Sequence, residues 1–139
     1  MRRTLLAVVL LMLAPFANAL AGDAEIKAAQ GVIDGQLKAF IANDGELAYS
    51  FAAPNVKQTF PSVDIFMSMV TNGYPPVRNP QNYSFGKVEQ TGPNSIIQQV
   101  MILGPDGKEY EAVYTLQLQD DGTFKITGCS LRASNSLST

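Results

Sequence analysis

The side chains that most often carry catalysis or bind metals are nearly absent from this sequence. It has no histidine and a single cysteine, Cys129, in 139 residues. Nucleophilic catalysis in its usual form needs a histidine base beside a serine or cysteine. Zinc and copper sites take their ligands mainly from histidine and cysteine. The sequence therefore excludes these kinds of site, and we expect no metal, no cofactor and no catalytic residue of these classes.

Two short motifs contain reactive residue types in an unfavourable context. Residues 84–87, Ser-Phe-Gly-Lys, match the Ser-x-x-Lys pattern of penicillin-recognising enzymes, but that pattern belongs on a helix and here it falls on a predicted strand. Asp120 and Asp121 could contact calcium, yet paired carboxylates in a hairpin turn commonly serve the turn itself. We interpret both motifs as structural.

Cys129 has three possible roles. It lies in an apolar segment, which favours a buried small hydrophobe. A reactive thiol would need a nearby cation to lower its pKa, and Lys125, four residues away, is not an obvious one. The third possibility is an intermolecular disulfide, because a single cysteine cannot form an internal one.

The N-terminus has the three parts of a secretory signal peptide. Arg2 and Arg3 precede an apolar run over residues 5–14, and Ala-Asn-Ala at 17–19 provides a small-residue exit. Ten apolar residues are too few to cross a bilayer as a helix, which needs about 20. We predict cleavage after Ala19, with Ala21 as a second site. The protein is then exported to the periplasm or secreted, and no membrane association remains.

Residues 20–133 are predicted to form a single domain, followed by a polar tail over 134–139. Removing Arg2 and Arg3 with the signal leaves eight basic and twelve acidic residues, a net charge of −4. An acidic domain without basic clusters is a poor match for nucleic acid, whose phosphates are bound by Lys and Arg.

Apolar spacing predicts helices in the first half of the domain. Apolar residues recur every three or four positions over 24–43, with Asp23 as N-cap, Gly45 as a left-handed cap, and Gln36 at the edge of the stripe. Residues 46–52 and a segment that begins after Ser62 and ends near Gly73 are predicted as two shorter helices. Three prolines over 74–80 predict a stiff, extended segment there.

The second half is predicted to be an antiparallel meander of four strands over 83–90, 95–103, 109–119 and 123–133, separated by turn-forming residues. The third strand has one apolar face, which includes Tyr114, whereas the second is apolar on both faces. The apolar phase of the fourth strand changes at Gly128, which indicates a β-bulge. We therefore predict an α+β fold: a long N-terminal helix and two shorter helices packed on a curved four-stranded antiparallel sheet, in a cone-shaped roll.

This order of elements resembles the nuclear-transport-factor-like fold, shared by ketosteroid isomerase and SnoaL-type cyclases. Three segments are more specific, at residues 69–77, 106–107 and 121–131. They resemble a family of exported bacterial proteins known only as a domain of unknown function, over about residues 24–131. The resemblance implies the fold and export, and it brings no established activity or catalytic residue.

Three hypotheses for function follow. The first is a protein-interaction or assembly module, a homodimer through the outer face of the sheet, because the second strand is apolar there. The second is a pocket for a small apolar ligand, with its polar groups supplied by Gln36, Tyr74, Arg78 and Tyr114; Tyr74 could instead serve packing, and Arg78 could be solvated.

The third hypothesis is a proton-transfer enzyme similar to ketosteroid isomerase, with a carboxylate base and hydroxyl donors. The available carboxylates are Asp34 and Asp64, and the available donors are Tyr49, Tyr74 and Tyr114. No pattern marks either carboxylate as a base, and Asp34 lies beside the apolar stripe rather than within it. The two non-catalytic hypotheses are therefore favoured.

Overall fold

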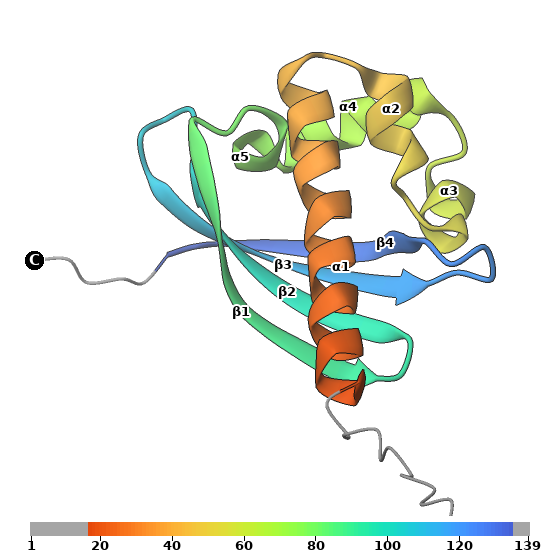
Figure 1. Ribbon diagram of the computed structural model, residues 1–139. Coiled ribbons are helices and arrows are strands. Elements are labelled where there is room, and N and C mark those ends of the chain that lie inside the picture. The colour runs from red at the N-terminus through yellow and green to blue at the C-terminus, as the bar shows by residue number, and fades with distance from the viewer. Residues whose placement is uncertain (1–16, 135–139) are drawn as a thin grey trace, which may run out of the picture.

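The computed structural model describes residues 17–134 of the chain (Figure 1). Helices come first, at α1 (Ala17–Ile41), α2 (Gly45–Ser50), α3 (Pro54–Thr59), α4 (Val63–Gly73) and α5 (Pro75–Arg78). Strands follow, at β1 (Asn82–Gly92), β2 (Ser95–Leu103), β3 (Glu109–Leu118) and β4 (Phe124–Ala133). The predicted α+β class and the meander are confirmed, since the four strands pair antiparallel in the order β1-β2-β3-β4.

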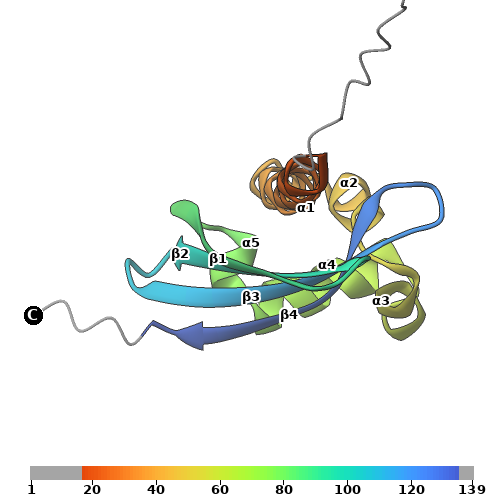
Figure 2. The same ribbon diagram turned by 60° about the horizontal axis from the view of Figure 1, so that its bottom comes forward.

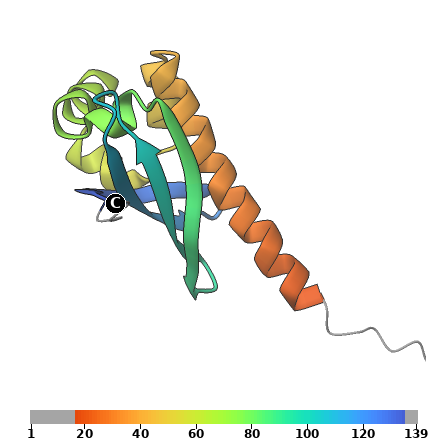
Figure 3. The same ribbon diagram turned by 90° about the vertical axis from the view of Figure 1, so that its left-hand side faces the viewer.

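The long helix α1 crosses the sheet, while the short helices gather at one end of it (Figures 1 and 3). Ile33, Leu37 and Phe40 on α1 are almost fully buried, and they belong to one core cluster with Val100 of β2 and Tyr114 of β3. Successive residues on β2 and β3 alternate between this core and the other face, so residues two apart share a face, as a strand period of two requires. The apolar side of α1 therefore packs on the sheet, as the sequence predicted.

The bulge predicted at Gly128 is confirmed. Thr115 of β3 pairs with Gly128, but the next residue, Leu116, pairs with Ile126, so Thr127 is an extra residue on β4. The extra residue moves Cys129 into register with Tyr114, on the core face. β1 has its own register shift between Phe85 and Val88.

The start of α1 and the cap at its end differ from the prediction. α1 begins at Ala17, so Asp23 lies inside the helix instead of capping it. The preceding residues are mostly alanine and leucine, which favour helix and extend it. The left-handed residue after α1 is Asn43, with φ 57°, and Gly45 begins α2 behind the N-cap Asp44. Asparagine tolerates this conformation better than most residues other than glycine.

Two helices that were not predicted begin at prolines. Pro54 opens α3 instead of only ending α2, and Pro75 and Pro76 open α5 in the segment predicted to be extended. A proline lacks the backbone N–H, but the first turn of a helix has no internal partner for that group, so proline is tolerated there. The described residues therefore contain four short helices, where two were predicted.

Some predictions fall on the ends of the chain. Residues 17–19 of the predicted signal peptide form the start of α1, and residues 1–16 lie outside the described residues, as do residues 135–139 of the predicted tail. Among the described residues, no helix is long and apolar enough to span a bilayer.

Candidate functional site

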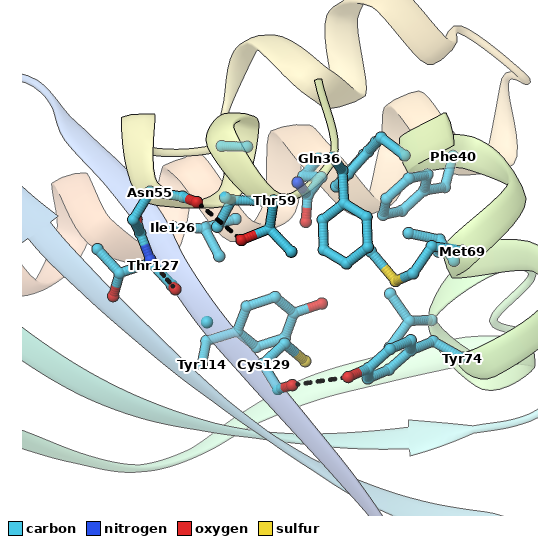
Figure 4. A pocket seen from close by; sticks show the side chains of 17 residues that line it. Gln36, Phe40, Asn55, Thr59, Met69, Tyr74, Tyr114, Ile126, Thr127 and Cys129 are labelled. Carbon is cyan, nitrogen blue, oxygen red and sulfur yellow. Dashed lines mark hydrogen bonds between the residues drawn. The ribbon is translucent and has the colours of Figure 1, made fainter. Parts of the chain in front are cut away.

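A cavity of about 250 Å³ lies between α1, α3 and α4 on one side and the ends of β3 and β4 on the other (Figure 4). Its floor is buried, with Phe40 and Tyr114 each 1% exposed, whereas Asn55 and Thr59 at the α3 rim are exposed. Its walls are mostly apolar and rich in aromatic rings: Phe40, Ala52, Val56, Phe60, Phe66, Met69, Val70, Tyr74, Val77, Tyr114, Ile126 and Cys129. This composition is typical of a site for a small, largely apolar molecule.

The bulge in β4 helps to build the cavity. Just before the bulge, Ile126 exchanges backbone hydrogen bonds with the segment between α2 and α3: its N–H donates to Phe51 O at 2.9 Å, and Ala53 N–H donates to its carbonyl at 2.8 Å. The side chain of Asn55 donates to the carbonyl of Thr127 at 3.0 Å. These bonds hold α3 over the end of the sheet, and the gap between them and α4 is the cavity.

Tyr114 is the most unusual residue of the cavity. Its hydroxyl oxygen is buried and has no nitrogen or oxygen hydrogen-bond partner in the described part of the chain; the Cys129 sulfur beside it is a weak acceptor. Burial raises the pKa of Tyr114 well above its ordinary value, so the phenol stays protonated and remains a donor. Leaving a buried polar group unsatisfied costs about 1–3 kcal/mol, so most such groups in proteins have partners.

Cys129 lies beside the Tyr114 hydroxyl (Figure 4). Burial raises the pKa of the Cys129 thiol to about 12, and the neighbouring Tyr114 hydroxyl opposes this rise only in part. Lys125 does not help to ionise the thiol, because its ammonium group donates to Ser50 O at 2.8 Å. A thiol that stays protonated at neutral pH is a weak nucleophile, so Cys129 serves the cavity as an apolar wall.

Two more of the predicted pocket residues line the same cavity. Gln36 is 4% exposed, and its amide nitrogen donates to Ala48 O at 3.1 Å, which orients the side chain. Its amide oxygen points toward the cavity (Figure 4). The hydroxyl of Tyr74 donates to Cys129 O at 3.2 Å, so this group ties the end of α4 to β4 while the ring forms part of the wall.

Arg78 is not brought together with the other three predicted residues. Its guanidinium donates to Phe40 O at 2.6 Å and to the Asn43 side chain at 2.5 Å, just past the end of α1. It lines a separate open cleft together with Asp44 and other residues. The last carbonyls of a helix lack internal partners and attract cations, so Arg78 acts as a cap for α1.

The candidate carboxylates also lie away from the cavity. Asp34 accepts a hydrogen bond from Tyr83 Oη at 2.6 Å and pairs with Lys38 at 2.9 Å, and these two contacts lower its pKa. Asp64 is exposed in the first turn of α4. None of the described residues that line the cavity is charged. The same part of the chain contains no group of three or more His, Cys, Asp or Glu residues that could hold a metal ion.

Sequence reasoning missed the α3 wall. Asn55, Val56 and Thr59 line the cavity from a helix that was not predicted, and Phe60 lines it directly after that helix. Proline at the first position of a helix was the available signal, because Pro54 followed by residues without another helix breaker is compatible with a short helix.

The sequence matches a known protein family over most of its length. The family described as Domain of unknown function (DUF4864) matches residues 22–139. The chain belongs to this family. The predicted membership of a domain-of-unknown-function family is thereby confirmed, and DUF4864 carries no assigned activity in its description.

Curated proteins and solved structures provide no further relative from which a function could be inferred. Among curated proteins, none matches this DUF4864 chain. A crystal structure of a protein from Kribbella flavida DSM 17836 is 14% identical, with a TM-score of 0.48, and covers 78% of this chain and 88% of that chain. At this TM-score and identity, the similarity carries no conclusion about the function of the DUF4864 domain.

Proposed function

We propose that this DUF4864 domain binds a small, uncharged, largely apolar ligand in the cavity between α3, α4 and the sheet. The observation that carries the proposal is the Tyr114 hydroxyl, which is buried at the cavity wall without a nitrogen or oxygen partner among residues 17–134. A ligand atom that accepts a hydrogen bond from this hydroxyl would recover the free energy that its burial costs.

The size of the cavity supports the same proposal. Well-packed interiors hold few voids larger than a water molecule. An apolar cavity of about 150 Å³ in another protein accepts benzene, and this one has about 250 Å³. Phe40 and Phe66 stack with ring centroids 6.0 Å apart, and the Tyr49 ring packs against Phe66 at 5.2 Å. Packed aromatic rings therefore form one wall of the cavity. A molecule the size of a single ring suits this space.

Binding is better supported than proton transfer. A ketosteroid-isomerase-like reaction needs a base within reach of the substrate, and Asp34 and Asp64 lie outside the cavity lining. The pKa of Asp34 is lowered by Tyr83 and Lys38, which weakens it as a base. The pKa of Cys129 is raised to about 12, which keeps its thiol from acting as a nucleophile.

Native mass spectrometry of the protein purified from its own host tests the proposal. We expect a bound molecule that copurifies with the wild type and is lost in Val56→Phe, because the larger ring fills the cavity from α3. Val32→Phe is the matched control: Val32 is also half-buried, on α1, but does not line the cavity, so its variant should retain the molecule. A clean apo mass for the wild type, or equal loss in both variants, would contradict the proposal.

We further propose that the outer face of the sheet forms a homodimer interface. Ile97, Met101 and Leu103 of β2 and Val113 of β3 are half-buried but lie outside the core cluster. Their central place on the sheet gives an apolar strip that a second copy could cover. Light scattering at high protein concentration tests this: a dimer is expected, dissociated by Val113→Lys, and a strictly monomeric wild type would overturn it.

We also propose that the protein is exported and that its fold is related to the nuclear-transport-factor-like cone. The DUF4864 match begins at residue 22, just after both predicted cleavage sites, Ala19 and Ala21. The long helix followed by short helices and a bulged meander has the element order of that cone. N-terminal sequencing of the protein from its host should begin at residue 20 or 22, and an intact Met1 would contradict export by cleavage.

A further inference from the structure

Two polar groups of the cavity, the Tyr114 hydroxyl and the Gln36 amide oxygen, have opposite hydrogen-bonding needs. We propose, resting on the proposed binding function, that the ligand is a neutral ring compound with a hydroxyl group, a phenol or cyclic alcohol, whose oxygen accepts from Tyr114 and whose proton is donated to Gln36. This inference names the chemical class of the ligand and the two residues that select it.

Tyr114 defines the first requirement. Its hydroxyl is a donor that meets no nitrogen or oxygen acceptor in the described part of the chain, and the neighbouring Cys129 sulfur is only a weak acceptor. Burial keeps the phenol protonated by raising its pKa. The ring is held in place, because Tyr114 pairs with Gln98 on one side and with Cys129 on the other within the sheet. The ligand must therefore bring an acceptor oxygen to a fixed position.

Gln36 defines the second requirement. Its amide nitrogen donates to Ala48 O, so the amide cannot reverse without losing that bond, and the oxygen is left as the atom directed at the cavity. An amide oxygen only accepts hydrogen bonds. A ligand group that accepts from Tyr114 and donates to Gln36 has both functions, and a hydroxyl is the smallest group that does.

The charge of the cavity defines the third requirement. Its described lining residues carry no charge, and the nearby cations are engaged elsewhere: Lys57 lies over the Tyr49 ring at 5.1 Å and Lys125 is bonded to Ser50 O. An ion that leaves water for such a site loses its hydration without gaining a counter-charge. The cavity should therefore reject carboxylates and amines of the same ring size.

Isothermal titration of the purified protein with phenol, anisole, toluene and benzoate tests these requirements one at a time. We expect the wild type to bind phenol more tightly than anisole, which can accept from Tyr114 but cannot donate to Gln36, and to bind benzoate least. In Tyr114→Phe, phenol should lose roughly tenfold in affinity, the value of one net hydrogen bond. Toluene, which makes no such bond, should bind Tyr114→Phe as tightly as the wild type, or more so.

The outcomes separate this inference from the function on which it rests. Equal changes for phenol and toluene in Tyr114→Phe, or benzoate binding as tightly as phenol to the wild type, would overturn the hydroxyl assignment while leaving ligand binding in place. If none of the four compounds binds the wild type, both the ligand class and the proposed function fail. The comparison among ligands on the wild type remains decisive even if the variant does not fold.

Discussion

Gln98 of β2 and Tyr114 of β3 are paired across the two strands, yet their side chains differ in whether their polar atoms have hydrogen-bond partners. Both are on the core face of the sheet, at 0% and 1% exposed. The Gln98 oxygen accepts from Gln30 at 3.0 Å, and its nitrogen contacts the carbonyls of Gly86, Lys87 and Gln99. The Tyr114 hydroxyl, by contrast, meets no nitrogen or oxygen partner among the described residues and has only the Cys129 sulfur beside it.

The difference divides the inner face of the sheet into two halves. On the β1 side, α1 and the irregular part of β1 supply hydrogen-bond partners for Gln98, so its buried polar atoms are satisfied. On the β4 side, Asn55 of α3 is bonded to Thr127 of β4, and a cavity remains between α3, α4 and the sheet (Figure 2 shows α1 and α3 at separate places around the sheet). Gln98 and Tyr114 are therefore similarly buried but differ in hydrogen bonding, because different helices and strands pack over the two side chains.

The largest effect is expected from Gln98→Met, which keeps the length of the side chain and removes its polar atoms. Gln30 and the carbonyl groups around Gly86 would lose their partner, so the free energy of unfolding should fall by about 3 kcal/mol. Urea unfolding measures this. Tyr114→Phe is the matched control in the open half and should change stability by less than about 0.5 kcal/mol, or raise it, because it removes an unsatisfied group. Similar losses in the two variants would remove the distinction between the halves.

A second effect concerns alkaline pH and the Cys129 thiol of the open half. Its pKa is raised to about 12 in the folded protein, from an ordinary value of 9.0. Between these values the unfolded chain gives up this proton while the folded chain keeps it, so stability falls as pH rises, by up to about 1.4 kcal/mol per pH unit. Cys129→Ala should flatten the decline in urea-unfolding free energy between pH 8 and 10.5. Parallel curves for wild type and variant would contradict the burial of the thiol.

The smallest effect is expected at the rim of the closed half, where Tyr83 of β1 donates to Asp34 of α1. This bond is the main cause of the lowered Asp34 pKa, and Lys38 adds to it. Because the pKa of Asp34 is lower in the folded protein than its ordinary value of 3.8, its ionised form stabilises the fold at pH values above 3.8. This stabilisation is lost as the pH falls through the lowered pKa. Tyr83→Phe should therefore raise the Asp34 pKa in an NMR titration, and it should reduce stability at pH 7 by less than about 1 kcal/mol because the site is partly exposed. An unchanged Asp34 pKa would count against this contact.

Much of the fold could be predicted from the sequence because it depends on local patterns. The strand limits of β2, the N-cap Ser62 of α4 and the bulge next to Gly128 follow from flanking turn residues, capping and a change of phase. Predictions failed where one residue type allows two local structures. Proline can end a helix or begin one, and Pro54 and Pro75 each begin one.

Of the four residues proposed for the pocket, Gln36, Tyr74 and Tyr114 line the cavity and Arg78 does not. Their chemistry was visible in the sequence, but their positions depended on contacts between distant segments. Arg78 reaches the end of α1 because α5 forms, and the mouth of the cavity exists because α3 is bonded to β4.

The sequence by itself determined the class of fold, the faces of the strands and the absence of histidine chemistry, since these depend on composition and on short-range periodicity. Only the tertiary structure decided that Gln98 is satisfied while Tyr114 is left facing a cavity. Whether a buried polar group finds a partner depends on atoms brought from elsewhere in the chain, and no local pattern records them.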